Sequence, residues 1–273
     1  MNGADGRSEG LVLKDVRKVF FRRTPNEVTA LGDVSLHVAT GDFITIIGSN
    51  GAGKSTLLNA IAGTFPIDAG SISLGSKDIT GMKEYARCCF VGRVFQDPRA
   101  GTAPSLSIEQ NMCMALQRGK PRRLSMGVTK KRREVVRQHL VEVGMGLESR
   151  MGTQVAKLSG GQRQAVSLLM ATIAEPSILL LDEHTAALDP KVAATIMELT
   201  DRIVQDRSLT TLMVTHNMEL ALRHGNRLIM MHGGRIILDV VRPEKDSLTI
   251  GGLVQKFHEA SGEVFATDRM LLG

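Results

Sequence analysis

The feature that most constrains the fold is the stretch GSNGAGKST at residues 48–56. It follows an apolar run typical of a β-strand and precedes the helix-forming run LLNAIAG, which ends at Gly63. The spacing GxxxxGKS is matched in full, and glycines in this strand–loop–helix context let backbone N–H groups converge on phosphate oxygens. Lys54 is expected to reach β- and γ-phosphates, and the Ser55 hydroxyl to ligate Mg²⁺. The stretch predicts a site for a nucleoside triphosphate.

The remaining chain alternates strand-like and helix-like stretches. Strand signals occur within residues 11–47, 70–74 and 91–96, and they return in 177–183, 211–216 and 227–240. A helical block over roughly 106–174 follows the Pro/Gly/Ser-rich stretch DPRAGTAPS, and a second helix is expected over about 190–205. This alternation predicts an α/β core with a parallel sheet and a helical lobe inserted in its middle.

Composition limits the classes of protein that the chain can belong to. The longest apolar runs, such as ILLL, fall far short of the roughly 18 residues needed to span a bilayer, and the leader MNGADGRSEG lacks a signal pattern. We therefore expect a cytosolic protein without a membrane span of its own. Cys88, Cys89 and Cys113 show no CxxC spacing, which indicates reduced thiols and no metal.

The net charge is +6, and much of the excess lies in RGKPRRLSMGVTKKRRE at 118–134. Nucleic-acid binding is one interpretation of such a stretch. A solvated helical face near anionic lipid or a partner protein is the other, and the absence of interleaved aromatic residues favours it. No nucleic-acid partner is expected.

A second candidate site element is SILLLDE at residues 177–183, an apolar strand that ends in two carboxylates. An isolated Asp-Glu after a strand is usually a solvated turn. With a phosphate loop upstream, Asp182 is expected to hold Mg²⁺, directly or through water, and Glu183 to orient and polarise an attacking water.

The third element is LSGGQRQ at residues 158–164, whose last three residues open the helix-forming run QRQAVSLLMATIA at 162–174. Adjacent glycines cost helix stability, but Ser-Gly-Gly before a helix exposes N–H groups at a positive dipole end, which suits an anion. The alternative is that Ser159 is an ordinary N-cap.

Taken in order, GSNGAGKST, VFQDP, LSGGQRQ, LLLDEHTAALD and VTH resemble the ATP-binding subunits of ABC transporters over roughly residues 11–240. The resemblance implies a phosphate-loop, RecA-like core with a parallel sheet, an antiparallel β subdomain and a helical subdomain at about 97–174. Residues 1–10 would then be a disordered leader, and 241–273 a C-terminal helical extension.

The resemblance also implies roles for single residues. Gln96 corresponds to a glutamine near Mg²⁺ and the attacking water, and His216 to a histidine that senses the γ-phosphate. Phe20 is similar to an aromatic residue that stacks on adenine, although Phe21 competes for that role. The signature residues contact the γ-phosphate bound to the other protomer of a head-to-tail pair, and Asp189 packs across that dimer. Each of these residues taken alone has an ordinary structural explanation.

The nucleotide-binding residues predicted in this way are Phe20, Gly48, Ser49, Asn50, Gly51, Ala52, Gly53, Lys54, Ser55, Thr56, Ser159, Gly160, Gly161, Gln162 and Asp189. The predicted metal ligands are Ser55, Gln96 and Asp182, and the predicted catalytic residues are Lys54, Gln96, Glu183 and His216.

The function implied is that of the ATPase subunit of a bacterial importer, with ATP and Mg²⁺ as ligands. Its partners would be a second copy, a separate membrane permease and, indirectly, an extracytoplasmic solute-binding protein, with the chain peripheral on the cytoplasmic face of the inner membrane. LDEHTAALDP, TTLMVTHNM and the tail resemble a subgroup linked to aromatic amino acids or similar solutes. The alternatives are a non-transport relative acting on nucleic acid, ribosomes or cluster assembly, and a regulatory module without turnover.

His184 departs from the resemblance, because many members carry Pro or Ala after the catalytic carboxylate. A protonatable side chain there could tune the site, and ordinary packing is the other interpretation.

Overall fold

The structure, a computed structural model, describes residues 10–120 and 126–261. The chain divides into two compact units. One, the discontinuous unit, is made of Met1–Arg87 and Ser208–Gly273, and the other, the inserted unit, is Cys88–Arg207. The predicted leader, apart from Gly10, and part of the basic stretch lie outside the described residues.

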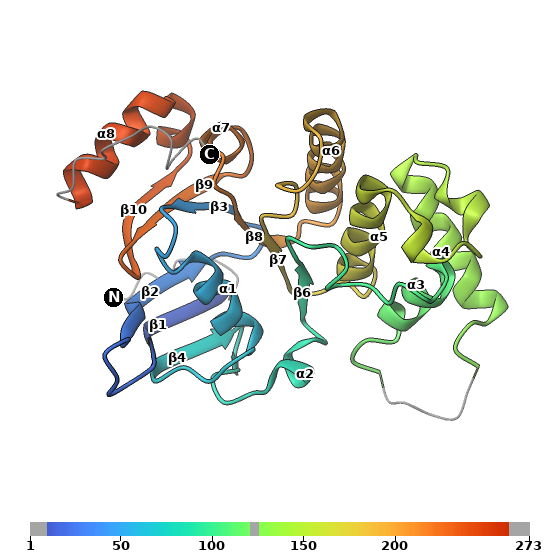
Figure 1. Cartoon of the computed structure of the whole chain (residues 1–273), viewed down its shortest axis with the longest axis horizontal. Helices are drawn as coiled ribbons and strands as arrows, with labels where there is room; N and C mark the ends of the chain where they lie inside the picture. The colour runs from blue at the N-terminus through green and yellow to red at the C-terminus, as the bar shows by residue number, and fades with distance from the viewer. Residues whose placement is uncertain (1–9, 121–125, 262–273) are drawn as a thin grey trace, which may run out of the picture. The chain divides into compact units, whose positions relative to one another are not determined.

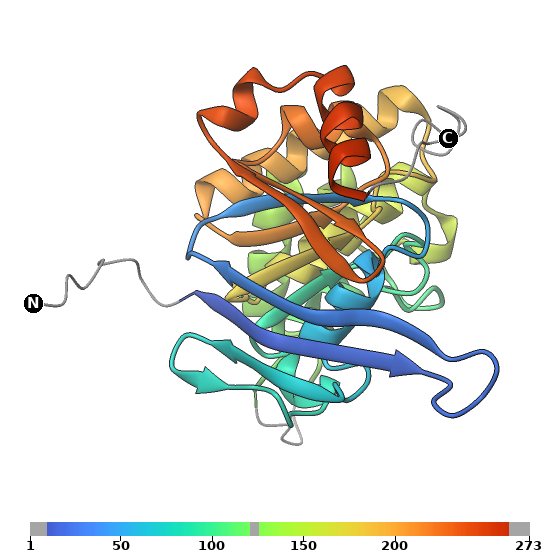
Figure 2. The same ribbon diagram turned by 90° about the vertical axis from the view of Figure 1, so that its left-hand side faces the viewer.

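The first sheet of the discontinuous unit is antiparallel. Figure 2 shows its long strands side by side, coloured blue to cyan, in the order β2-β1-β4-β5. Apolar residues of β1 such as Leu11, Leu13 and Val16 are buried. One apolar face therefore covers the core, as expected for an antiparallel sheet. The strands are β1 (Leu11–Phe20), β2 (Val28–Val38), β4 (Ala69–Leu74) and β5 (Lys77–Asp78).

The second set of strands in this unit contains the predicted parallel pairing. β3 runs parallel to both β8 and β9, and β9 turns through Gly233-Gly234 into the antiparallel β10. β8 is buried throughout and β3 nearly so, which explains their continuous apolar sequences. The α/β prediction is confirmed. These strands are β3 (Phe43–Gly48), β8 (Thr210–Val214), β9 (Arg227–His232) and β10 (Arg235–Val241).

Helices cover these strands. α1 contacts both β2 and β3, and α8 packs beside β10 (Figure 1). Leu253 and Phe257 of α8 are fully buried against Met218 of α7 and Met230 of β9, so the C-terminal helix is part of the core. The helices of this unit are α1 (Lys54–Ala62), α2 (Glu84–Arg87), α7 (Met218–Arg223), the 3₁₀ helix η3 (Glu244–Ser247) and α8 (Ile250–Ser261).

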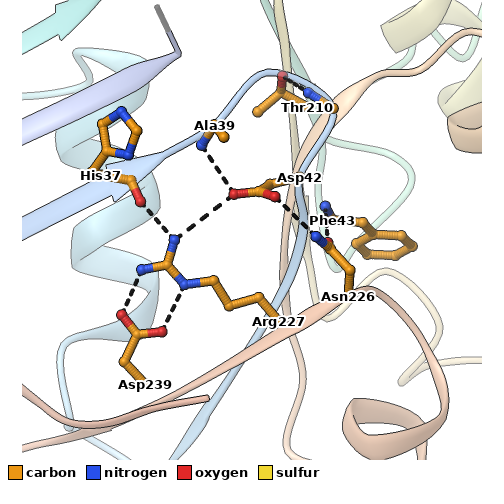
Figure 3. Close-up of polar contacts among 9 residues, drawn as sticks. His37, Ala39, Asp42, Phe43, Thr210, Asn226, Arg227 and Asp239 are labelled. Atoms are coloured by element: carbon orange, nitrogen blue, oxygen red, sulfur yellow. Dashed lines mark hydrogen bonds and ion pairs between the residues drawn. The ribbon is translucent and has the colours of Figure 1, made fainter. Parts of the chain in front are cut away.

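A polar network centred on Arg227 ties four of these strands together (Figure 3). The guanidinium donates to both carboxylate oxygens of Asp239 on β10, at 2.6 and 2.5 Å, and to the His37 carbonyl on β2 at 2.6 Å. Asp42, just before β3, lies 3.8 Å from it and accepts from Asn226 at 2.9 Å. The hydrogen bonds that Arg227 donates to the Asp239 carboxylate raise the pKa of Arg227. The network anchors the amino end of β3, whose other end carries the phosphate loop.

The inserted unit is mostly helical. α5 lies at its centre, is buried along most of its length, and contacts α3, α4, α6 and β6. The parallel strands β6 and β7 lie beside these helices. The elements are β6 (Val91–Val94), α3 (Ile108–Leu116), α4 (Lys130–Val143), the 3₁₀ helices η1 (Leu147–Arg150) and η2 (Val155–Lys157), α5 (Gly160–Thr172), β7 (Ile178–Asp182) and α6 (Pro190–Asp206).

Two predicted boundaries were wrong. The strand expected over 91–96 ends at Val94, because Asp97 accepts hydrogen bonds from the backbone of Arg99 and Ala100 and starts a turn. The signature helix begins at Gly160, so both glycines lie inside its first turn. The division into leader, helical subdomain and C-terminal extension stays a prediction. In residues 10–120 and 126–261, no helix has the length and apolar character needed to cross a membrane.

Candidate nucleotide site

The loop between β3 and α1 adopts a backbone that its glycines make possible. Gly48 has φ +148° and Gly53 φ +98°, in the region that favours glycine. A Cβ at Gly48 would lie 2.1 Å from the Met231 carbonyl oxygen, and one at Gly53 would lie 2.5 Å from that of Ala30. The loop is therefore seated against neighbouring backbone, which explains the glycines at both positions of the motif.

Lys54 is held at the mouth of this loop. Its side chain is buried, and its ammonium donates to the carbonyls of Gly48 at 2.7 Å and Ser49 at 3.0 Å. Lys54 is also the first residue of α1, whose first turn contains no acidic side chain. A fixed cation and a positive helix end thus point at the same loop, which is the arrangement that binds phosphate oxygens.

His216 leaves the sheet at the same edge as the phosphate loop. β8 pairs with β3 in parallel, with Ile46 opposite Val214, and the Thr215 N–H donates to the Ile46 carbonyl at 3.1 Å. His216 comes next, half-buried, before Asn217 caps α7. The carboxyl ends of parallel strands are where α/β proteins bind ligands, so the structure brings these two predicted elements together.

The adjacent phenylalanines at the end of β1 differ in environment. Phe20 is half-buried and packs edge-on against Phe65, with ring centroids 5.4 Å apart. The Lys18 ammonium lies 5.3 Å from the centre of the Phe20 ring. Phe21, by contrast, is 69% exposed. Phe20 therefore already has aromatic and cationic neighbours, and its stacking role stays a prediction beside that of Phe21.

In the inserted unit, Asp182 is the last residue of β7 and Glu183 the first beyond it. Both are half-buried. Glu183 has φ +45°, a left-handed conformation that costs a residue with a side chain about 1–3 kcal/mol and that recurs at functional sites. The strained turn therefore supports the prediction that this carboxylate has a catalytic role.

Arg93 of β6 contacts the Asp182 carboxylate. A role for Arg93 was not predicted from the sequence. Its Nη2 atom lies 3.4 Å from Asp182 Oδ2, and its guanidinium lies 4.5 Å from the centre of the Phe95 ring. The available signal was a single charged residue in an otherwise apolar stretch, VGRV.

Gln96 lies just beyond β6 and is exposed. Because β6 and β7 are parallel and Val94 pairs with Leu181, Gln96 and the Asp182–Glu183 pair leave the strands at the same end. The structure thus brings together the predicted glutamine and the two predicted carboxylates.

The signature residues form a capped helix start. The Ser159 hydroxyl accepts from the Gln162 N–H at 3.3 Å, and the Gln162 side chain accepts from the Ser159 N–H, also at 3.3 Å. Ser159 is therefore an N-cap, as the alternative interpretation proposed. Gly161 is buried, and a Cβ there would lie 2.3 Å from Val192 Cγ1 on α6, so packing requires this glycine. Gly160 is exposed and has no such neighbour: its Cβ would meet only Leu188, at 3.5 Å.

The predicted residues thus fall into two groups. The discontinuous unit contains the phosphate loop, His216 and Phe20. The inserted unit contains Gln96, the Asp182–Glu183 turn, the signature residues and Asp189, which is exposed at the start of α6.

Comparison with known proteins identifies the class to which this arrangement belongs. The chain matches the ABC transporter family over residues 31–186. It belongs to this family and is an ATP-hydrolysing subunit of a transporter of the import type.

Three relatives illustrate the match. The tyrosine transport ATP-binding protein of Clostridioides difficile (strain R20291) is 45% identical over 92% of this chain and 99% of its own length. The methionine import ATP-binding protein MetN of Brucella abortus (strain 2308) is 36% identical over 77% of this chain, which spans 54% of that relative. Among solved structures, the dimeric post-hydrolysis state of the ATP-binding cassette MJ0796 with ADP and Pi covers 85% of this chain. Its TM-score is 0.73, its identity 27%, and 98% of that structure is covered.

Proposed function

We propose that the chain drives the uptake of an aromatic amino acid, with tyrosine as the first candidate, through a separate membrane permease. The observation that carries this proposal is the 45% identity to a tyrosine transport ATP-binding protein over nearly the full length of both chains. The MetN relative matches over a smaller share of both chains and at lower identity. An extracytoplasmic solute-binding protein would deliver the solute, and the chain would lie on the cytoplasmic face of the membrane.

Within this proposal the phosphate loop holds ATP. Its N–H groups and Lys54 bind the phosphates, the hydroxyl of Thr56 lies near the α-phosphate, and Phe20 stacks on adenine. Lys54, already fixed on two carbonyls of the loop, supplies a localised positive charge without reorganisation.

Ser55, Gln96 and Asp182 are proposed as the Mg²⁺ ligands. They offer a hydroxyl, an amide oxygen and a carboxylate, the hard oxygen donors that Mg²⁺ prefers. When bound there, Mg²⁺ would supply positive charge that neutralises the phosphate oxygens. Among the described residues, no group of three or more His, Cys, Asp or Glu side chains is placed to hold a metal ion.

Glu183 is the proposed acceptor for the attacking water. Gln96 lies beyond the same end of the β6–β7 pair as Glu183 and would orient the water. His216 senses the γ-phosphate from the carboxyl edge of β8.

The site is completed by a second copy of the chain in a head-to-tail dimer. The exposed start of α5 supports this, since Gly160 has no packing requirement that would exclude a side chain. Ser159, Gly160, Gly161 and Gln162 would approach the γ-phosphate of the partner, with Asp189 packed across the interface. The dimeric solved relative is consistent with this arrangement.

The surface around residues 97–112 is the proposed permease contact. Ser105 is exposed in this segment and suits cysteine cross-linking, whereas Ser107 is buried as the N-cap of α3 and does not.

The test is solute uptake by the complete transporter in proteoliposomes with ATP inside and the solute-binding protein outside. We expect uptake of labelled tyrosine that exceeds uptake of methionine and is lost in Lys54→Ala. Equal binding and uptake of both solutes would contradict the proposed specificity. Failure of the chain to co-purify with a permease would contradict the transport role.

A further inference from the structure

The two strands of the inserted unit carry one charged residue each. β6 reads VGRV and β7 reads ILLLD, so every other position of the pair is glycine or apolar. Strands of parallel sheets are usually apolar, and a charge within them is costly unless it is paired. Arg93 and Asp182 pair with each other, and Arg93 has no role in the nucleotide chemistry described above.

Strand register explains how the side chains meet. Arg93 lies opposite Leu180 on β7, and Leu180 and Asp182 are two residues apart and face the same side. The Arg93 side chain therefore extends toward the carboxyl end of β7 to contact the Asp182 carboxylate. Phe95, two residues after Arg93, is on the same face and supports the guanidinium at 4.5 Å from its ring centre.

The contact is strong enough to matter and weak enough to break. The side chains are only 13% and 15% exposed, so water screens the pair less than at a free surface. Yet the distance from Arg93 Nη2 to Asp182 Oδ2 is 3.4 Å, longer than the usual range for hydrogen bonds and ion-paired donors.

We propose that Arg93 is a positioning residue that acts as the built-in counter-cation of Asp182 and competes with Mg²⁺ for its carboxylate. The proposal rests on the proposed metal role of Asp182. Without Mg²⁺–nucleotide, the guanidinium neutralises and orients the carboxylate. When Mg²⁺ arrives, Arg93 gives up this contact and stays on the Phe95 ring. Arg93 thereby sets the Mg²⁺ concentration at which the site fills.

The test measures binding, not turnover. Arg93→Met keeps much of the apolar stem and removes the charge. ADP is titrated by calorimetry at a series of Mg²⁺ concentrations. The Mg²⁺ concentration that gives half of the full gain in ADP affinity should be roughly three- to tenfold lower in the variant than in wild type, the effect expected of one partly buried ion pair. ADP affinity in EDTA should be unchanged, because Arg93 contacts the metal ligand and not the nucleotide.

Two further variants make this result specific. Arg93→Lys keeps a cation and should stay close to the wild-type Mg²⁺ dependence. Arg99→Met, an exposed arginine of the same segment whose side chain is paired with Asp97, is the matched control and should not differ from wild type. Circular dichroism establishes that each variant is folded.

The outcome separates the inference from the assignment on which it rests. If Asp182→Asn weakens the Mg²⁺ dependence while Arg93→Met leaves it unchanged, the inference is wrong and the metal assignment stands. If Asp182→Asn has no effect, the metal assignment itself is wrong. If Arg93→Met changed the ADP affinity equally with Mg²⁺ and with EDTA, the role of Arg93 would be purely structural and the proposal would be overturned.

Discussion

The Nε2 atom of His184 lies 3.2 Å from the hydroxyl of Thr200, which is 16 residues further along the chain, on α6. The Thr200 hydroxyl donates to the Ile196 carbonyl at 2.8 Å, so its oxygen accepts from the His184 Nε2–H. Both residues are buried. The bond links the turn that carries Glu183 to α6, which supports the packing interpretation of His184.

Thr200→Val should lower the free energy of unfolding by about 1–3 kcal/mol, because it leaves a buried imidazole N–H without its acceptor. Thr195→Val is the matched control: Thr195 makes the same type of bond, to Lys191, on the exposed side of α6. It should stay within about 0.5 kcal/mol of wild type. Denaturant unfolding measures both, and equal losses for the two variants would contradict the role given to the His184 contact.

Gly161→Ala should destabilise the inserted unit by about 1–3 kcal/mol, because the added Cβ would overlap Val192 Cγ1. The double variant Gly161→Ala/Val192→Ala, which removes this methyl together with Cγ2, should recover most of the loss in thermal unfolding. Gly160→Ala, whose Cβ meets only ordinary contact distances, should be nearly neutral. A double variant no more stable than Gly161→Ala would show that packing is not what requires this glycine.

Glu183→Gln should retain ATP binding while hydrolysis falls by about 10²–10⁴-fold, since the amide keeps the shape of the side chain but cannot accept a proton from water. Because hydrolysis separates the proposed dimer, the variant should accumulate as a dimer with ATP and stay largely monomeric with ADP. Size-exclusion chromatography with light scattering measures this.

The control for this experiment repeats it with the proposed permease present, because a dimer interface too weak to persist in the isolated subunit would hide the effect. Turnover of Glu183→Gln at the wild-type rate would show that the catalytic assignment is wrong.

Stability should depend on pH through Lys245. Burial and then Arg242 lower its pKa to about 8, against a smaller opposing effect of Asp246. Its ammonium donates to the carbonyls of His224 and Gly225. Between pH 8 and its ordinary value of 10.5, the unfolded chain holds a proton that the folded chain has lost, so the contribution to stability rises with pH in this window.

Between about pH 7.5 and about pH 9.5, the free energy of unfolding of wild type should rise by about 2 kcal/mol relative to that of Lys245→Met, measured by denaturant unfolding. Lys256→Met, at an exposed ion pair with Glu244, is the matched control and should follow the wild-type pH dependence. A pH dependence of Lys245→Met identical to that of wild type would contradict the assignment.

The local parts of the site were predictable from sequence because local rules determine them. The spacing from Gly48 to Lys54 specifies a strand, a loop and a helix start within a few residues, and the structure has all of them. The apolar run before Asp182 likewise predicts a buried strand, and β7 confirms it. The fold class followed from the alternation of such elements.

Contacts between distant elements were not predictable in this way. Arg93 and Asp182 are 89 residues apart, and only the register of β6 on β7 places them on one face. The requirement for Gly161 depends on where α6 crosses α5, which no local pattern contains. The helix expected over about 190–205 is α6, with Asp189 at its N-cap, but the role of Asp189 across a dimer concerns a second chain.

The pairing of β3 has a consequence for synthesis on the ribosome. β3 is made early, yet its hydrogen-bonded neighbours β8 and β9 follow Arg207, and the Arg227 network that anchors it closes still later. A nascent chain that ends before Thr210 has the whole phosphate-loop motif but neither of these supporting strands. The inserted unit is therefore free to fold first, and ATP binding should appear only after β8 and β9 have emerged, which nucleotide cross-linking to stalled chains of increasing length would record.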